Sequence, residues 1–500
     1  MKKINIISVT IIGILLLSSC KGFLDLSPSQ SIPTDKSIST VAEAGSALNG
    51  IYSRMTSSNY YGRRMLGYGD LKGGDFGIPT AGISDDAMYV FSHEQDKNTN
   101  SGFWTTIYDI ILQTNNIIIN IENGSVQIND TKEQKALDNV KGQALAIRAL
   151  AHFDLVRLYG YPYLKDQGAS LGVPVVTTIL DAYAKLKRNT VAEVYTQIIK
   201  DLSNAIPLLS NDKVLGNINS WGAKTLLARA YLYKGDWDNA YLTAKDVIAN
   251  SGYEPYTAAN WAASWSKQGS SESMFELIIM ANESDLGNSS PRSFFYPRNV
   301  IKTYLGAAVA SDVFLNMFKQ YPDDCRWEML DLDEFGNELS KGREIPGRKG
   351  WMKKYEGDGK TPLSACNIKI LRLSEAYLIG AEAAFKKPEK DLVNGVAWLN
   401  TIRSRNPALT ALTISEPEST LLEEVALERR KEFLGEGQTY FDILRNGGTV
   451  HYDGPVFFGE PTVPLNGRSL TVDWNYYKCV LPISIDELNA NSEMKQNPKY

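Results

Sequence analysis

The chain has 500 residues, of which 43% are hydrophobic and 22% are charged, a balance typical of a globular protein rather than a disordered one. Its formal net charge of −5 leaves no basic surplus to neutralise phosphate groups, so nucleic acid is excluded as an expected partner. Beyond the amino-terminal run described next, no hydrophobic stretch reaches the length of a membrane-spanning helix.

The amino terminus has the features of a lipoprotein signal peptide. Lys2 and Lys3 precede an apolar run at residues 4–17, which suits a signal-peptide core and is short for a transmembrane helix. Two serines then lead to Cys20, and this order resembles a lipobox, whose cysteine is acylated before the preceding bond is cut. The sequence therefore predicts a signal peptide at residues 1–19 and stable membrane attachment through more than one acyl chain on Cys20. The alternative is an ordinary secretory signal in which Cys20 is incidental.

The first part of the mature chain is predicted to be a tether followed by helices. Residues 20–40 contain prolines and serines with little hydrophobic periodicity, which indicates a tether that connects the lipid anchor to the folded domain. Residues 41–500 are predicted to form a single domain. Its first helices are expected at residues 41–56 and, more clearly, at residues 103–122.

The strongest periodic signals follow. Leu145, Ala149, Phe153 and Val156 recur at the spacing of one apolar helix face, which predicts a helix at residues 142–159 with a polar side opposite.

A second periodic helix is predicted at residues 190–209. Thr190 and Glu193 have the spacing of a capping box, which indicates that the helix begins there.

Two helical hairpins are predicted next. Residues 221–249 match the residue offsets of a tetratricopeptide repeat, and residues 369–404 form a second hairpin. Thr420 and Glu423 are predicted to cap one more helix, which ends near Leu434. Because such hairpins cannot bury their apolar faces alone, they imply stacked neighbours. The expected fold is mainly α, a tetratricopeptide-like scaffold of about four helix pairs within residues 41–56, 103–250 and 369–436.

Long irregular segments separate these helices. Residues 57–102 and 251–368 are rich in Gly, Ser, Asn, Pro and aromatic residues, with short strands expected at 274–280 and 351–356. Loops carried by a rigid scaffold commonly hold binding sites, so the ligand-binding region is placed in these two segments.

The remaining chemistry-bearing residues give no catalytic or metal motif. Cys325, Cys366 and Cys479 lack a C-x-x-C pattern and are expected to be buried thiols, although a disulfide or a reactive thiol is the alternative. A calcium-like stretch begins at Asp331 but has Gly342 where the bidentate glutamate belongs. No cofactor is expected, and a structural calcium ion elsewhere is left open.

Several motifs, in order along almost the whole chain, resemble the SusD/RagB family of outer-membrane nutrient-binding lipoproteins from Bacteroidetes. The helix segment L-R-L-S-E-A-Y-L at residues 371–378, followed by A-E-A, is one of them. Departures occur at Thr439, Asn446 and Lys499, where the family often has Arg, Trp and Gly, and they put local contacts in doubt. The matching segments are residues 20–28, 142–160, 371–383, 399–403, 428–445 and 481–500.

The resemblance implies a cell-surface binding protein without catalysis. Family members cap a TonB-dependent (SusC-like) transporter barrel in the outer membrane and capture oligosaccharides or, less often, peptides. Their ligands usually contact aromatic residues on loops. An outer-membrane glycosidase is the remote alternative, because its paired carboxylates cannot be recognised without a motif.

The motif residues themselves are interpreted as structural. Asp154 and Arg157 have the i,i+3 spacing of an ordinary helix ion pair. Glu428, Arg429 and Glu432 are expected to form buried or half-buried pairs within the scaffold.

Ligand contact is predicted for aromatic and polar residues on two loops, residues 67–98 and 288–297, and for Trp351 outside them. An aromatic ring would stack on a sugar ring, while acidic, amide or guanidinium groups hydrogen-bond its hydroxyls. The alternative for each residue is that it fills the small core of its own loop. The predicted ligand-binding residues are Tyr68, Asp70, Tyr89, Phe91, Arg292, Phe295, Tyr296 and Trp351.

Overall fold

A computed structural model provides the structure of the protein. The predicted signal peptide, Cys20, most of the tether and the calcium-like stretch lie outside the residues that it describes. The described residues are 38–78, 86–89, 91–95, 101–181, 183–279, 290–297, 305–330, 350–357, 366–452, 456–457, 460–461 and 470–500.

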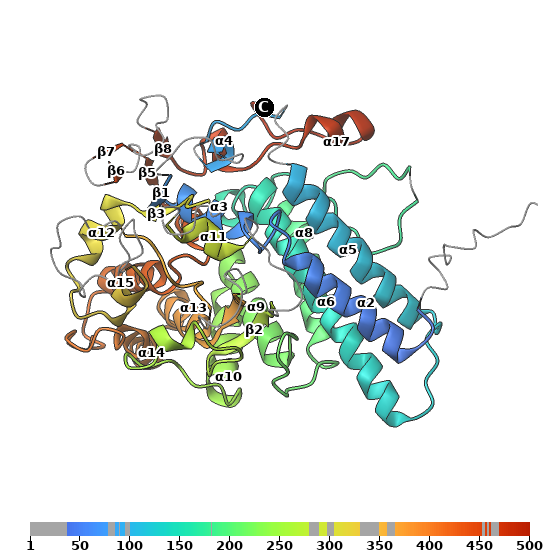
Figure 1. The fold of residues 1–500 in the computed structure, drawn as a ribbon, viewed down its shortest axis with the longest axis horizontal. Helices are drawn as coiled ribbons and strands as arrows, with labels where there is room; N and C mark the ends of the chain where they lie inside the picture. Colours follow the sequence, from blue (N-terminus) through green and yellow to red (C-terminus); the bar gives the residue numbers. More distant parts are fainter. Residues whose placement is uncertain are drawn as a thin grey trace, which may run out of the picture.

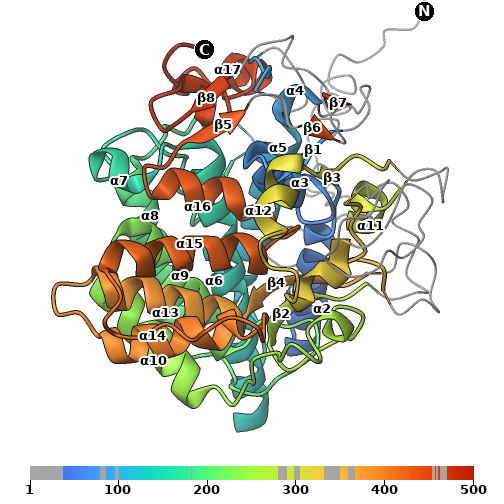
Figure 2. The same ribbon diagram turned by 90° about the vertical axis from the view of Figure 1, so that its left-hand side faces the viewer.

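Long helices lying side by side form the main body, as predicted for a mainly α, tetratricopeptide-like scaffold (Figures 1 and 2). At one end, α6 packs against α5 and α8, and α2 lies across α5 and α6. At the other end, α13 packs against α10, α14 and α15. The helices of this array are α2 (Val41–Met55), α5 (Ser101–Glu122), α6 (Thr131–Tyr159), α8 (Val191–Ala205), α9 (Ser220–Lys234), α10 (Trp237–Asn250), α13 (Leu373–Lys386), α14 (Leu392–Arg403) and α15 (Glu418–Glu432).

The central helix α6 is longer and more buried than predicted. It begins at Thr131 because Asp130 caps it, accepting a hydrogen bond from the Glu133 amide. The predicted polar side was wrong, since Asp154 and Arg157 are both buried. They form the predicted ion pair, and Asp154 also accepts hydrogen bonds from Tyr60 and Tyr61.

Capping residues fix where the next helices begin. The predicted capping box of α8 is confirmed, because Thr190 and Glu193 each bond the other's backbone amide. The prediction for α15 was wrong. This helix begins after Pro417, so Thr420 lies inside its first turn and caps nothing.

The two predicted hairpins are confirmed. α9 ends at Gly235, whose φ of 77° reverses the chain, and Asp236 then caps α10. Small side chains allow α10 and α13 to approach closely: Ala244 and Gly380 lie at their contact, with Trp398 of α14 packed against Gly380.

Short antiparallel strand pairs hold the irregular segments. The strand predicted at 274–280 is observed as β2 (Ser273–Leu277), which pairs with β4 (Ile368–Arg372). The strand predicted at 351–356 was wrong, because these residues turn rather than extend. The other pairs are β1 (Phe76–Gly77) with β3 (Val309–Ala310), β5 (Val450–Tyr452) with β8 (Leu470–Val472), and β6 (Val456–Phe457) with β7 (Glu460–Pro461).

Short helices connect these strands and the longer helices. They are α3 (Arg64–Lys72), α4 (Asp86–Tyr89), α7 (Tyr163–Asp166), η3 (Ala262–Ser264), α11 (Pro291–Phe295), α12 (Asp312–Phe318), η5 (Cys325–Leu330), α16 (Thr439–Arg445), η6 (Tyr477–Cys479) and α17 (Ile485–Ala490).

Buried ion pairs join the irregular segments to the array. Three arginines from different elements, Arg326, Arg372 and Arg405, converge on Glu432 of α15. Arg326 also binds Glu428, so the predicted buried pairing of these motif glutamates is confirmed. Such pairs favour one arrangement strongly, because a lone buried charge is costly.

The three cysteines are buried and unpaired, as predicted: Cys325, Cys366 and Cys479. The segment that follows Cys479 returns to the end of α6. There the Asn497 side chain donates to the carbonyl oxygens of Tyr159 and Leu481, at 2.9 and 2.8 Å.

Candidate functional site

The first predicted ligand loop is folded inward around α3. Tyr68 is fully buried, and its ring stacks on Phe441 at 5.6 Å between centroids. Asp70 is buried beside it and accepts a hydrogen bond from the Gly437 amide at 2.9 Å. Burial raises the pKa of Asp70 well above its ordinary value, since the Gly437 amide and a longer hydrogen bond from Thr439 Oγ1 offset only part of the lost hydration.

Tyr89 and Phe91 belong to the same buried layer. The Tyr89 ring meets Phe294 of α11 at 5.9 Å, which brings the first predicted loop against the second. The Phe91 ring lies 4.1 Å from Nζ of Lys72, which is itself fully buried. Burial lowers the pKa of Lys72 well below its ordinary value.

The second predicted loop contributes α11 and its end. Phe295 is buried against Phe76 and stacks on Tyr355. The Arg292 guanidinium lies 5.0 Å from the Tyr296 ring, and its Nη1 donates to the Glu356 carbonyl at 2.9 Å. Its Nε is buried and has no acceptor within the part of the chain that the structure describes.

The structure thus brings the two predicted loops together through ring contacts, and it buries all eight predicted residues. Arg292, Tyr296 and Trp351 keep 6–7% of their surface exposed, whereas the other five keep 3% or less. These buried side chains pack the two loops around α3 and α11. Ligand contact by these residues stays a prediction.

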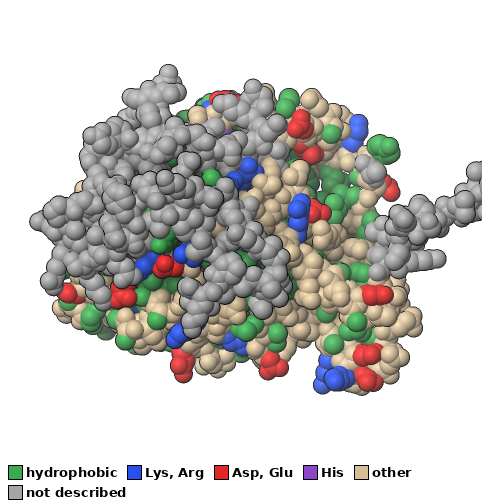
Figure 3. Space-filling view, in the orientation of Figure 1, with side chains coloured by type: hydrophobic (Ala, Val, Ile, Leu, Met, Phe, Trp, Pro, Cys, Tyr) green, Lys and Arg blue, Asp and Glu red, His purple; other side chains and the backbone are tan. Residues whose placement is uncertain are grey.

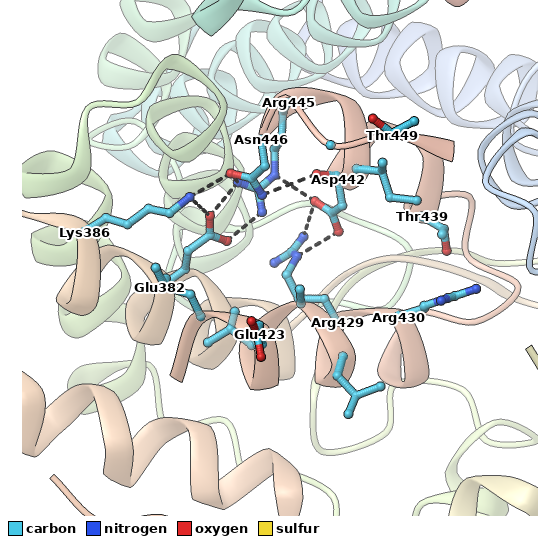
Figure 4. Close-up of a pocket in the computed structure, with 16 residues that line it drawn as sticks. Glu382, Lys386, Glu423, Arg429, Arg430, Thr439, Asp442, Arg445, Asn446 and Thr449 are labelled. Atoms are coloured by element: carbon cyan, nitrogen blue, oxygen red, sulfur yellow. Dashed lines mark hydrogen bonds and ion pairs between the residues drawn. The ribbon is translucent and has the colours of Figure 1, made fainter. Parts of the chain in front are cut away.

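A separate cleft is lined by residues of α13, α15 and α16 and of the segment after α16 (Figure 4). Its volume is about 610 Å³, within the range of pockets that hold ligands. Its residues come from three separate sequence segments. They are Glu382, Lys386, Leu422, Glu423, Val425, Ala426, Leu427, Arg429, Arg430, Thr439, Asp442, Ile443, Arg445, Asn446, Gly448 and Thr449.

A chain of buried charges lies at the base of this cleft (Figure 4). Arg445 binds Glu382 with two hydrogen bonds, at 2.6 and 2.9 Å, and its Nε donates to Asp442 at 2.9 Å. Arg429 binds the same Asp442 with two more, at 2.8 and 3.0 Å.

Both carboxylates of this chain are held ionised. Burial alone would raise the pKa of Glu382, but Arg445 and Lys386 lower it well below its ordinary value. Burial opposes ionisation of Asp442 too, and there Arg429 and Arg445 lower the pKa.

No pattern in the sequence predicts this cleft. Arg429, the one cleft residue that the sequence predicts to pair within the scaffold, does so with Asp442. One usable signal existed in the departures from the family pattern, because Thr439 and Asn446 both line the cleft with side chains smaller than the expected Arg and Trp. The third departure, Lys499, has a φ of 73°, a conformation that glycine adopts more readily.

Other site types leave no sign in the described residues. Among these, no group of three or more His, Cys, Asp or Glu side chains could hold a metal ion. None of the described helices is both long and apolar enough to cross a bilayer. Over the described part of the face in Figure 3, acidic and basic side chains are interspersed rather than gathered in one patch.

Comparison with known proteins decides the family. Residues 22–232 match a family model described as SusD-like, starch-binding and associating with the outer membrane, and residues 341–500 match the SusD family model. A SusD-like protein of Formosa agariphila is 31% identical over an alignment that covers all of both chains. The chain belongs to the SusD family.

Other SusD family members support the same assignment. A SusD-like protein of Bacteroides ovatus is 24% identical over 69% of this chain and 65% of its own length. A solved structure of a candidate sugar-binding protein from Bacteroides vulgatus is 36% identical, with a TM-score of 0.81 over 93% of this chain and 99% of that one.

Proposed function

We propose that this SusD family protein is a lipid-anchored, surface-exposed outer-membrane protein that captures oligosaccharides without cleaving them. It then delivers them to a SusC-like, TonB-dependent transporter. The observation that carries the proposal is the 36% identity, over almost the whole chain, to a candidate sugar-binding protein of the same fold. The family description, starch-binding and associating with the outer membrane, supports both the ligand class and the location.

We place the sugar contact at the end of α11 and at Trp351. Arg292, Tyr296 and Trp351 are the least buried of the eight predicted residues. The guanidinium of Arg292 lies over the Tyr296 ring and retains an unused buried donor, Nε. A ring for stacking and a guanidinium for hydroxyl groups are the two elements that sugar recognition needs.

Isothermal titration against a glycan panel that includes maltoheptaose tests this proposal. Tyr296→Ala is expected to weaken binding at least tenfold, about 1.4 kcal/mol, as for a central aromatic contact. Tyr183→Ala is the matched control, because Tyr183 is 93% exposed on a different loop. No heat with any glycan, together with heat from a peptide mixture, would favour the second candidate, peptide capture by the same fold.

Catalysis and delivery are tested separately. Incubating the pure protein with a labelled glycan should give no product, and product formation would instead support the glycosidase alternative. Co-purification of a transporter barrel with the tagged protein from its native outer membrane is expected. Its absence under mild detergent would contradict the delivery role.

A further inference from the structure

The loop between α7 and α8 presents an apolar tip to solvent. This loop, termed the Tyr183 loop, comprises residues 177–187, all of them described except residue 182. Tyr183 is 93% exposed, more than any other large hydrophobic side chain of the described residues, and Ile179 is 44% exposed. A turn closed by the Ala184 amide and the Asp181 carbonyl, at 3.0 Å, holds Tyr183 at the tip. Scattered apolar side chains are normal on a surface, whereas apolar residues gathered at one projecting point indicate a contact surface.

Both stems of the Tyr183 loop are fixed to the body. At one stem, the buried side chain of Asn115 in α5 donates to the carbonyl oxygens of Val176 and Thr178, both at 3.1 Å. At the other stem, the Asn491 side chain donates to the Leu186 carbonyl at 2.9 Å. Because the stems are fixed, the tip is held away from the body rather than folded against it.

The Tyr183 loop lies on the side of the body where the described chain begins. There the Ser39 carbonyl accepts a hydrogen bond at 2.8 Å from the amide of Gln127, which follows the end of α5. Helix α5 links the two features, since its Asn115 holds the loop. Leu112 of α5 is 39% exposed, and Ile128, just after this helix, is 46% exposed. Figure 1 shows the loop projecting from the side that α2 and α5 form.

The composition of the tip suits the interface between lipid and water. A tyrosine places an apolar ring and a polar hydroxyl at that depth, while aliphatic neighbours enter the edge of the acyl layer. Lys185 donates to the Ser492 hydroxyl at 3.2 Å and has no carboxylate partner among the described residues, whereas Lys187 pairs with Glu493. The long stem of Lys185 lets its ammonium group reach a lipid phosphate. Asp181 is the one acidic residue of the loop, so apolar insertion rather than charge would dominate the contact.

We propose that the Tyr183 loop inserts into the interface of the outer membrane and holds the body in one orientation on the bilayer, which rests on the lipid anchor of the proposed function. Residues 21–37 separate Cys20 from Ile38 and span about 60 Å when fully extended, too far to orient the body by themselves. The same attachment keeps the loop near the bilayer at an effective concentration on the order of millimolar, so weak insertion is enough. The contact is separate from the proposed sugar contact, so Tyr183→Ala should leave glycan binding in solution unchanged.

A fluorescent reporter beside Tyr183 tests the insertion. Ala184→Cys, labelled with a nitrobenzoxadiazole dye, keeps Tyr183 and changes only an exposed side chain. The labelling is specific, because the remaining thiols are buried: Cys325, Cys366 and Cys479. The lipidated full-length protein is reconstituted into vesicles of phosphatidylethanolamine and phosphatidylglycerol that hold no other protein. Spin-labelled lipid in these vesicles should quench the dye at residue 184 about twofold or more. The same dye on Leu242→Cys, 60% exposed on α10, is the matched control and should keep its emission.

A second variant and flotation of the vesicles separate the outcomes. Tyr183→Asp in the labelled chain should remove most of the quenching, although the protein still floats with the vesicles. Unchanged quenching in that variant, equal quenching at residues 184 and 242, or flotation without quenching would each overturn the insertion and leave the anchor intact. Protein that does not float would refute the anchor and the proposal with it. A dye that is shielded from aqueous iodide only in native outer membrane, and never in these vesicles, would assign the loop to the transporter and overturn the lipid contact.

Discussion

Acidification is expected to destabilise this protein through one histidine. His152 is buried in the middle of α6, where its Nε2 accepts a hydrogen bond from the Val176 amide at 3.2 Å. Its Nδ1 lies 3.0 Å from the Arg148 carbonyl oxygen, to which it donates. A proton added at Nε2 would point at an amide hydrogen, so the folded protein holds the neutral ring. Burial lowers the pKa of His152 to about 4.

The expected change in the free energy of unfolding follows from the difference in proton binding between the folded and the unfolded chain. In the unfolded chain a histidine binds a proton below about pH 6.5, whereas in the folded chain His152 does so only below about pH 4. Between these two pH values the unfolded chain therefore binds one more proton than the folded chain. The stability contributed by the neutral ring is therefore present above pH 6.5 and lost as the pH falls. Between pH 7 and pH 4 the free energy of unfolding should fall by about 3 kcal/mol from this residue alone.

The assay compares the wild-type chain with His152→Gln, which keeps a side-chain acceptor but cannot titrate. Urea unfolding followed by tryptophan fluorescence and circular dichroism gives the free energy at each pH, provided that the two transitions coincide. Other acid-sensitive groups are shared, so the difference between the two pH profiles isolates His152. Parallel profiles between pH 7 and pH 4 would refute the reasoning.

The remaining predictions concern packing, ion pairs and the anchor. Glu375→Ala should lower the free energy of unfolding in urea by about 3–5 kcal/mol, because it leaves the buried Arg229 of α9 without its ion-pair partner. The double variant Arg229→Met, Glu375→Leu should recover most of that stability, and no recovery would contradict this account. Gly69→Ala should lower the melting temperature sharply, since its Cβ would lie 1.9 Å from a backbone oxygen, whereas Gly45→Ala, with open space around it, should stabilise α2 by about 1 kcal/mol. Cys20→Ser should move the protein from the membrane fraction to the soluble fraction on cell fractionation, and retention in the membrane would argue against the lipid anchor.

Local patterns predicted the helical scaffold well where the signal was itself local. Thr190 and Glu193 lie three residues apart and cap α8 as expected, because a capping box depends on neighbours in the chain. The same pattern at Thr420 and Glu423 failed, since Pro417 had already fixed the start of α15 one turn earlier. The start of α6 was missed because its first turns have little apolar periodicity, although Asp130 and Glu133 give a capping signal there.

Features that depend on distant segments could not be predicted in the same way. Residue type and loop position predict ligand contact for eight residues, whereas the structure buries all eight. Periodicity does not reveal burial for a residue such as Tyr68, whose ring neighbours come from α5 and α16. The cleft was invisible for the same reason, because its lining residues meet only when α13, α15 and α16 are assembled.

The contact between Asn497 and the end of α6 bears on how the protein matures. Tyr159 and Asn497 are separated by 338 positions, yet one side-chain amide joins the Tyr159 carbonyl to that of Leu481. During synthesis, α6 would emerge long before Asn497, and until then the Tyr159 carbonyl could accept only from Arg188, whose Nη2 donates to it at 3.0 Å. Helix α6 can therefore form early, whereas the Asn497 hydrogen bonds at its end are among the last contacts made. A chain interrupted before residue 497 would lack the one side-chain amide that joins the end of α6 to Leu481.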